Sequence, residues 1–188
     1  MTMLIAGLVL FLGAHTFTTL RDARGAVITR VGDGPYKGLY SLVSLAGLVL
    51  IVIGFGRYRA AGYAPVWDPP GWLLPVALIL MWLSFVALVA AYAPPGRIKG
   101  WLRHPMLVGV KAWALAHLLV NGDLGSILLF GAFLAWAVYD RIAVKRRGDA
   151  GAPPSGFATG DAIALAVGSI AYAAMFWAHP WVIGVPIT

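Results

Sequence analysis

The stretch "WLLPVALILMWLSFVALVAAY", residues 72–92, decides the fold class. It contains no charged side chain, and a helix needs about 20 mostly apolar residues to cross the hydrocarbon core of a bilayer. The rest of the chain has the same character, because 61% of its 188 residues are hydrophobic and only 11% are charged. Soluble domains carry roughly a quarter of charged residues, so the composition predicts an integral membrane protein in a lipid bilayer.

Apolar segments of this kind recur along the chain and predict an all-α, polytopic helical bundle with about six transmembrane helices. The segments cover approximately residues 3–20, 38–56, 72–92, 105–120, 124–142 and 162–178. The first lacks a basic start and a cleavage site, so we expect a retained span and not a signal peptide. No polar stretch is long enough for a soluble domain, and we expect a single transmembrane domain over residues 1–188.

The tight sequence "NGD" joins the fourth and fifth segments into a predicted antiparallel hairpin. Gly122 suits the left-handed position after a helix, and Asp123 can cap the helix that follows. At the other end of the fourth segment, His104 precedes Pro105, a residue that suits the first position of a helix. We therefore expect the fourth helix to begin at Pro105, with His104 as its cap.

Basic residues are distributed unevenly over the loops between the segments. Loops two and four, together with both termini, hold only Arg57 and Arg59. Loops one, three and five hold Arg21, Arg24, Arg30, Lys37, Arg97, Lys99, Arg103, Arg141, Lys145, Arg146 and Arg147. The positive-inside rule assigns these three loops to the cytoplasm and both termini to the outside. The net charge of +7 is explained in this way, without a nucleic-acid partner.

Histidines within the predicted spans are the candidates for a cofactor site, because the absence of cysteine excludes thiolate ligands and cysteine nucleophiles. His15 lies in the first segment and His117 in the fourth. Two histidines from different helices can hold a haem iron from opposite faces. The alternative is that both are packed, hydrogen-bonded structural residues. His179 lies in the aromatic belt expected at the outer interface.

Helical geometry divides the fourth segment into two faces. His104 and Lys111 are seven residues apart and share one face, whereas His117 is rotated from His104 by roughly 140°. Trp113 and Asn121 flank His117 at four residues on either side. This second face is the predicted cofactor wall, where Trp113 offers an apolar ring and Asn121 can orient the imidazole.

Depth in the bilayer leaves the ligand pair open. At 1.5 Å per residue, His15 lies about 9 Å from Arg21, and His117 lies about 20 Å from His104. If both reference residues mark the cytoplasmic surface, the two ligands differ in depth by roughly 11 Å, an offset that tilt reduces. A His15–His104 pair matches better in depth and is the rival assignment.

Lys111 is the costliest residue of the fourth segment, because a charged lysine at the bilayer centre costs about 2.5–3.5 kcal/mol on insertion scales. It can bind an acidic group of a substrate or a haem propionate, or lose its proton on burial. It can also extend its long stem toward the interface. The sequence leaves these roles open.

Residues 102–141, "LRHPMLVGVKAWALAHLLVNGDLGSILLFGAFLAWAVYDR", and 10–16, "LFLGAHT", resemble the NnrU family of membrane proteins. The resemblance implies a bacterial inner membrane protein that is associated with denitrification. It also implies haem b, because the related plant 15-cis-zeta-carotene isomerase uses haem b with histidine ligands to isomerise a lipophilic polyene. Carried over by motif, His15 and His117 are the expected haem ligands, and His104 matches a further family histidine.

Three functions follow as hypotheses. The first is a haem b protein with a redox, nitrogen-oxide-linked or isomerase role. The isomerase is thought to exchange a histidine ligand for a cysteine, and that step cannot transfer to a chain without cysteine. The second is a non-enzymatic accessory protein with structural histidines. The third, a methyltransferase-like enzyme, is suggested only by "RHP", a motif shared with isoprenylcysteine methyltransferases.

Overall fold

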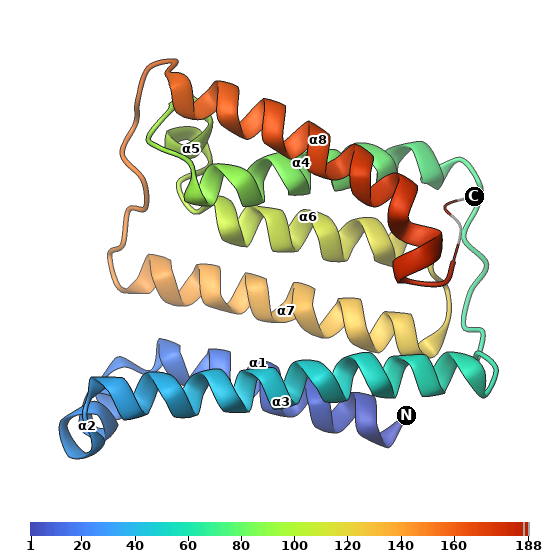
Figure 1. Ribbon diagram of the computed structural model, residues 1–188, viewed down its shortest axis with the longest axis horizontal. Coiled ribbons are helices and arrows are strands. Elements are labelled where there is room, and N and C mark those ends of the chain that lie inside the picture. The colour runs from blue at the N-terminus through green and yellow to red at the C-terminus, as the bar shows by residue number, and fades with distance from the viewer. Residues whose placement is uncertain (186, 188) are drawn as a thin grey trace. The chain divides into compact units, whose positions relative to one another are not determined.

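The computed structural model describes residues 1–185 and 187, and the regular elements within them are all helices (Figure 1). They are α1 (Thr2–Thr19), α2 (Arg21–Val31), α3 (Asp33–Ala60), α4 (Leu73–Tyr92), α5 (Arg97–Leu102), α6 (Pro105–Val120), α7 (Leu124–Arg146) and α8 (Thr159–Val182). The six apolar segments predicted from the sequence correspond to α1, α3, α4, α6, α7 and α8. The predicted all-α class is therefore confirmed.

Among the described residues, five helices are long and apolar enough to cross a membrane, namely α1, α3, α4, α7 and α8. The sixth apolar helix, α6, has 16 residues. At 1.5 Å per residue it is about 24 Å long, somewhat less than the roughly 30 Å of a hydrocarbon core. The chain is a multi-pass membrane protein.

Two short helices, α2 and α5, lie in the segments predicted as loops one and three. The first is polar, and none of its residues is buried. It follows α1 after the single residue Leu20. The second has only six residues and carries Arg97 and Lys99. Hydrophobic periodicity does not detect such elements, because they are too short or too polar to show it.

The chain forms two compact units that are interleaved in sequence. The first unit comprises residues 1–68 and 122–144, and so contains α1, α2, α3 and most of α7. The second comprises residues 69–121 and the part from residue 145 onward, and so contains α4, α5, α6 and α8. The expected single domain over residues 1–188 stays a prediction.

Glycines bring α1 and α3 into backbone contact within the first unit. A Cβ atom on Gly7 would lie 2.6 Å from the backbone nitrogen of Ile51, and one on Gly47 would lie 2.6 Å from that of Phe11. Helices in lipid pack through such small residues, because no hydrophobic driving force holds them together there. Gly13 of α1 has open space at its Cβ position instead.

In the second unit, α4 packs on α6 and α8 through small and polar side chains. The buried Ser84 hydroxyl donates a hydrogen bond of 2.8 Å to the carbonyl of Gly109 on α6. The Trp82 indole donates one of 2.9 Å to the Ser169 hydroxyl on α8. These bonds satisfy polar groups that would otherwise face hydrocarbon.

Asp161 joins the beginnings of α5 and α8. Its carboxylate accepts the backbone N–H of Ala158, at 2.9 Å, in a cap of its own helix. It also accepts the N–H groups of Arg97 at 2.9 Å and Ile98 at 2.7 Å, the first residues of α5. The side chain is only 1% exposed. One carboxylate thus caps two helices that are distant in sequence.

The turn between α6 and α7 differs in part from its prediction. Gly122 does not have the predicted left-handed conformation. Its carbonyl accepts the N–H groups of Val66 and Trp67, which lie in the loop between α3 and α4. That loop therefore holds the turn in an extended form. The predicted cap by Asp123 is confirmed, because its carboxylate accepts the Ser126 N–H at 3.0 Å. Burial would raise the pKa of Asp123, but hydrogen bonds from Ser126 and Tyr58 lower it below its usual value.

Candidate functional site

His15 has one ring nitrogen bound to its own helix. Nδ1 lies 2.7 Å from the carbonyl oxygen of Phe11, one turn earlier in α1. A carbonyl can only accept, so Nδ1 carries the proton and Nε2 carries the lone pair. Histidines that bind metals commonly donate their other ring N–H to a carbonyl in this way, which fixes the orientation of the ring. The local geometry of His15 is therefore that of a possible iron ligand.

Aromatic rings from three helices surround the His15 imidazole. The Phe11 ring stacks on it with centroids 4.2 Å apart. The Tyr40 ring of α3 lies at 5.4 Å, and the Trp136 ring of α7 meets the imidazole edge-on at 5.6 Å. Phe133 of α7 extends the cluster at 5.6 Å from Phe11. These residues all belong to the first unit, and together they form an apolar, aromatic environment for the imidazole.

The Trp136 indole N–H in this cluster is buried and has no hydrogen-bond partner within the described residues. Buried donors are nearly always paired, and an unpaired one calls for a specific explanation such as an ion or ligand. This donor belongs to the ring that meets His15 edge-on.

His117 repeats the backbone geometry of His15 in the second unit. Its Nδ1 lies 2.8 Å from the carbonyl oxygen of Trp113, again one turn earlier, and the same tautomer follows. The Trp113 ring centroid lies 5.3 Å from that of the imidazole. The predicted face that combines Trp113 and His117 is thus formed.

Asn121 is bound to the main chain of α6. Its amide nitrogen donates a 2.8 Å hydrogen bond to the main-chain carbonyl of His117. This bond closes the last turn of α6, where carbonyl groups lack partners within the helix. The Trp113 carbonyl orients the His117 ring, and a role of Asn121 toward the imidazole stays a prediction.

His179 of α8 lies in the neighbourhood of His117. This proximity was not predicted, since the two residues are 62 positions apart and α8 carries no local pattern that points to α6. The Nδ1 of His179 lies 2.7 Å from the carbonyl oxygen of Val185. The second unit therefore brings two histidines together at the C-terminal ends of their helices.

His104 occupies the predicted position immediately before α6, but its side chain makes no capping hydrogen bond. Its Nε2 is buried and has no partner within the described residues. A Cβ atom on Gly151 would lie 2.7 Å from this nitrogen, so the glycine backbone packs directly on it. An iron atom could reach Nε2 only if the loop around Gly151 moved.

Arg103 in the same "RHP" motif has a strained backbone. Its φ is 63° and its ψ −55°, and the N–H of His104 donates to the carbonyl of Leu102 at 2.7 Å. These are the features of a rare γ-turn. The Arg103 carbonyl accepts the N–H of Ala152 at 2.8 Å, which fixes the turn to the loop before α8.

Lys111 lies in the middle of α6 and is partly exposed. Within the described residues, no hydrogen bond and no ion pair is found for its ammonium group. Its predicted roles toward an acidic group stay predictions.

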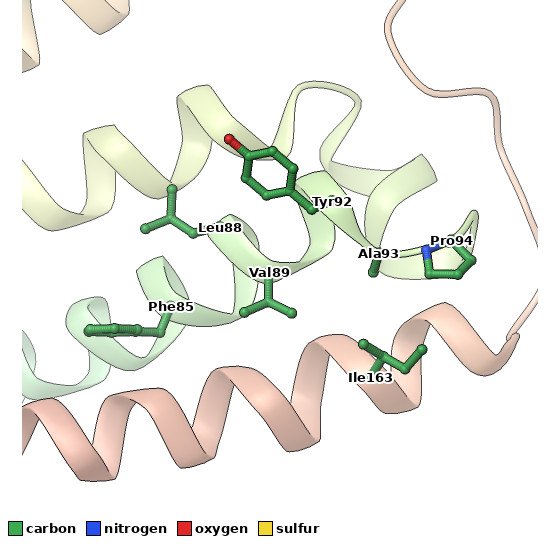
Figure 2. Close-up of a pocket in the computed structure, with 7 residues that line it drawn as sticks. All are labelled: Phe85, Leu88, Val89, Tyr92, Ala93, Pro94 and Ile163. Atoms are coloured by element: carbon green, nitrogen blue, oxygen red, sulfur yellow. The ribbon is translucent and has the colours of Figure 1, made fainter.

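A shallow apolar groove of about 550 Å³ lies between α4 and α8 in the second unit (Figure 2). Val89 of α4 and Ile163 of α8 extend into the space between the two helices. The complete lining consists of Phe85, Leu88, Val89, Tyr92, Ala93, Pro94 and Ile163. The groove offers no titratable group except the Tyr92 phenol, so it suits an aliphatic chain and not a polar substrate.

The candidate residues are thus divided between the two units. His15 belongs to the first unit, and the other five, His104, Lys111, Trp113, His117 and Asn121, belong to the second. Within the described residues, no group of three or more His, Asp or Glu side chains could hold a free metal ion. Both ligand pairs, His15 with His117 and His15 with His104, stay predictions.

Comparison with known proteins identifies the family of the chain. The profile of the family described as NnrU protein matches residues 3–187, nearly the whole chain. Neither curated proteins nor solved structures give a match.

Proposed function

The chain belongs to the NnrU protein family, and on this premise we propose that it binds haem b within the membrane, with His15 and His117 as ligands of the iron. The observation that carries the proposal is their shared geometry. Each imidazole has Nδ1 bound to the carbonyl oxygen of the residue four positions earlier, at 2.7 Å for His15 and 2.8 Å for His117. The lone pair of each is then on Nε2, the nitrogen best directed away from its own helix.

The surroundings of both histidines fit a large, flat, apolar cofactor. Phe11, Tyr40 and Trp136 supply aromatic surface at His15, and Trp113 supplies it at His117. The unpaired indole N–H of Trp136 supports a ligand with polar groups near His15. When bound, haem b would supply a redox-active iron with an exchangeable axial position. The residues of the chain would orient the imidazoles and exclude water.

Two roles fit such a protein in the bacterial inner membrane. One is linked to nitrogen-oxide metabolism in denitrification, and the other is isomerisation of a lipophilic polyene. The apolar groove between α4 and α8 supports a lipophilic partner, since it presents only one polar side chain group. The absence of cysteine favours the first role over an isomerase that exchanges a histidine for a cysteine ligand.

The visible spectrum of the purified protein tests the proposal. After haem-replete expression, we expect a bis-histidine b-type spectrum that is lost in His15→Ala and in His117→Ala. Trp177→Phe is the control, because Trp177 is 75% exposed on α8 and is not one of the candidate residues. A colourless wild-type protein would refute haem binding. Loss of haem in His104→Ala but not in His117→Ala would establish the rival pair.

A non-enzymatic accessory protein is the second candidate, and one observation favours it. The bonds of both imidazoles to their own helices, and the stacking of Phe11 on His15, also suit purely structural residues. In that case the wild type is colourless, and His15→Ala lowers the thermal stability without any spectral change.

A further inference from the structure

We infer that Arg24 and Tyr36 bind a carboxylate of the cofactor held at His15. The inference rests on the proposed haem function and extends it to residues that the sequence motifs did not indicate. It starts from two polar groups of the first unit that are buried without partners.

Tyr36 lies in the second turn of α3 and is only 7% exposed. Its hydroxyl group is buried and has no hydrogen-bond partner within the described residues. The guanidinium carbon of Arg24, on α2, lies 5.6 Å from the centre of the Tyr36 ring. The Nε of Arg24 is also buried and without a partner in the described part of the chain. Two unsatisfied donors from neighbouring helices therefore lie together.

The position of this pair connects it with His15. Tyr36 precedes Tyr40 by four residues on α3, so the two side chains share one face and differ by about 6 Å along the axis. The Tyr40 ring lies 5.4 Å from the His15 ring. α1 ends at Thr19, about one helical turn after His15, and α2 begins at Arg21. Arg24 lies in the first turn of α2. Tyr36 thus lies about one turn from Tyr40, toward the start of α3, and Arg24 lies beside the Tyr36 ring.

The chemistry of the pair is that of a carboxylate receptor. A guanidinium group and a phenol O–H are both donors, and arginine binds carboxylates through charge-assisted hydrogen bonds. Arg24 forms no ion pair within the described residues, and Asp33, on α3, is paired with Lys37 at 2.6 Å. The Nε atom of Arg24 is buried without an acceptor, which is unfavourable, and an anionic ligand would supply one. Haem b brings two propionates on one edge of the macrocycle.

Binding of haem b and of haem dimethyl ester, in which both carboxylates are blocked, tests the inference. Titration of the detergent-solubilised apo-protein, followed by absorbance, should show about tenfold tighter binding of haem b, as expected for one charge-assisted contact. Arg24→Gln and Tyr36→Phe should reduce this preference severalfold while the spectrum of the bound haem stays unchanged. Arg21→Gln, on the exposed start of α2, and Tyr63→Phe, 61% exposed between α3 and α4, are the matched controls.

The possible outcomes separate the inference from the function on which it rests. If the wild type binds neither haem nor its ester, the haem function itself is refuted, and the inference fails with it. If the wild type binds both equally, or if Arg24→Gln and Tyr36→Phe keep the full preference, only the inference is overturned. It is also overturned if Arg24→Gln leaves the preference intact but removes bound phosphatidylglycerol in nanodiscs, because the anion is then a lipid phosphate.

Discussion

A substitution at Gly47 can test the close contact between the backbones of α1 and α3. A Cβ atom there would lie 2.6 Å from the backbone nitrogen of Phe11, which cannot move aside as a side chain can. Gly47→Ala should therefore cost about 1–3 kcal/mol through overpacking. Alanine has a higher helix propensity than glycine, which offsets roughly 1 kcal/mol of this cost. The net effect should be destabilising. Thermal unfolding in detergent measures the change.

Gly13→Ala is the control for this prediction, because its Cβ would meet open space on the same pair of helices. It should leave the melting temperature unchanged or raise it slightly. Equal melting temperatures for Gly13→Ala and Gly47→Ala would show that the two helices are not packed as described.

Asp161→Asn should be strongly destabilising although it changes few atoms. The carboxylate accepts three backbone N–H groups, two of them through Oδ2. An amide nitrogen at either oxygen position would face a donor, and each buried donor left unpaired costs about 1–3 kcal/mol. Asp149→Asn is the surface counterpart, since Asp149 is exposed and accepts only the N–H of Gly151. Equal stability of both variants in thermal unfolding would argue against the double cap.

In the candidate site, only contacts between residues of the same helix could be predicted from the sequence. Helical spacing correctly paired Trp113 with His117, because residues four apart share a face. The aromatic rings around His15 come from α3 and α7, and the spacing of α1 contains no information about them. The hydrogen bond from Asn121 to the His117 main-chain carbonyl was not predicted for a related reason, since an unpaired carbonyl at a helix end leaves no mark on the sequence pattern.

At the scale of elements, α5 and the turn after it combine polar sequence with backbone strain. Arg103 has a φ of 63°, a region that costs a residue with a Cβ of order 1–3 kcal/mol. Arg103→Gly should therefore be more stable than Arg103→Ala, by about 1 kcal/mol, because both lose the side chain but only glycine relieves the strain. Chemical or thermal unfolding of the two variants compares them directly. Identical stabilities would mean that the turn relaxes in the absence of the arginine side chain.

The long apolar helices could be predicted from the sequence, whereas the short polar ones could not. α6 begins at Pro105, as predicted, because proline fixes the first position of a helix. The start of α5 at Arg97 could not be predicted, since its cap comes from Asp161, 64 residues later. Gly122 was assigned a left-handed turn from its own neighbours, whereas the loop at Val66 and Trp67 decides its conformation. Local patterns fail wherever a distant segment satisfies the backbone.

At the scale of the whole molecule, the orientation in the membrane is open to a direct test, because the chain has no natural cysteine. Single cysteines can be placed at Tyr63, 61% exposed in loop two, and at Phe157, 72% exposed in loop five. The positive-inside rule predicts that a membrane-impermeant maleimide labels Tyr63→Cys in intact cells and Phe157→Cys only after permeabilisation.

The same experiment decides whether the short helix α6 crosses the bilayer. If α6 does not cross, α7 and α8 have the opposite direction in the membrane, and the loop with residue 157 lies outside. Both cysteines then react in intact cells. Labelling of Phe157→Cys alone would indicate that the whole molecule has the opposite orientation. The permeabilised sample, in which both variants must react, controls for accessibility.

The double cap by Asp161 has a consequence for synthesis. The amides at the start of α5 leave the ribosome 64 residues before the carboxylate that satisfies them. At about 5–20 residues per second, the nascent chain waits on the order of 3–13 s for its missing acceptor. During this interval α5 depends on water or lipid headgroups, and its final form is set only when the last transmembrane segment has entered the bilayer. Truncation before residue 161 would therefore leave a defect more than sixty residues upstream of the stop.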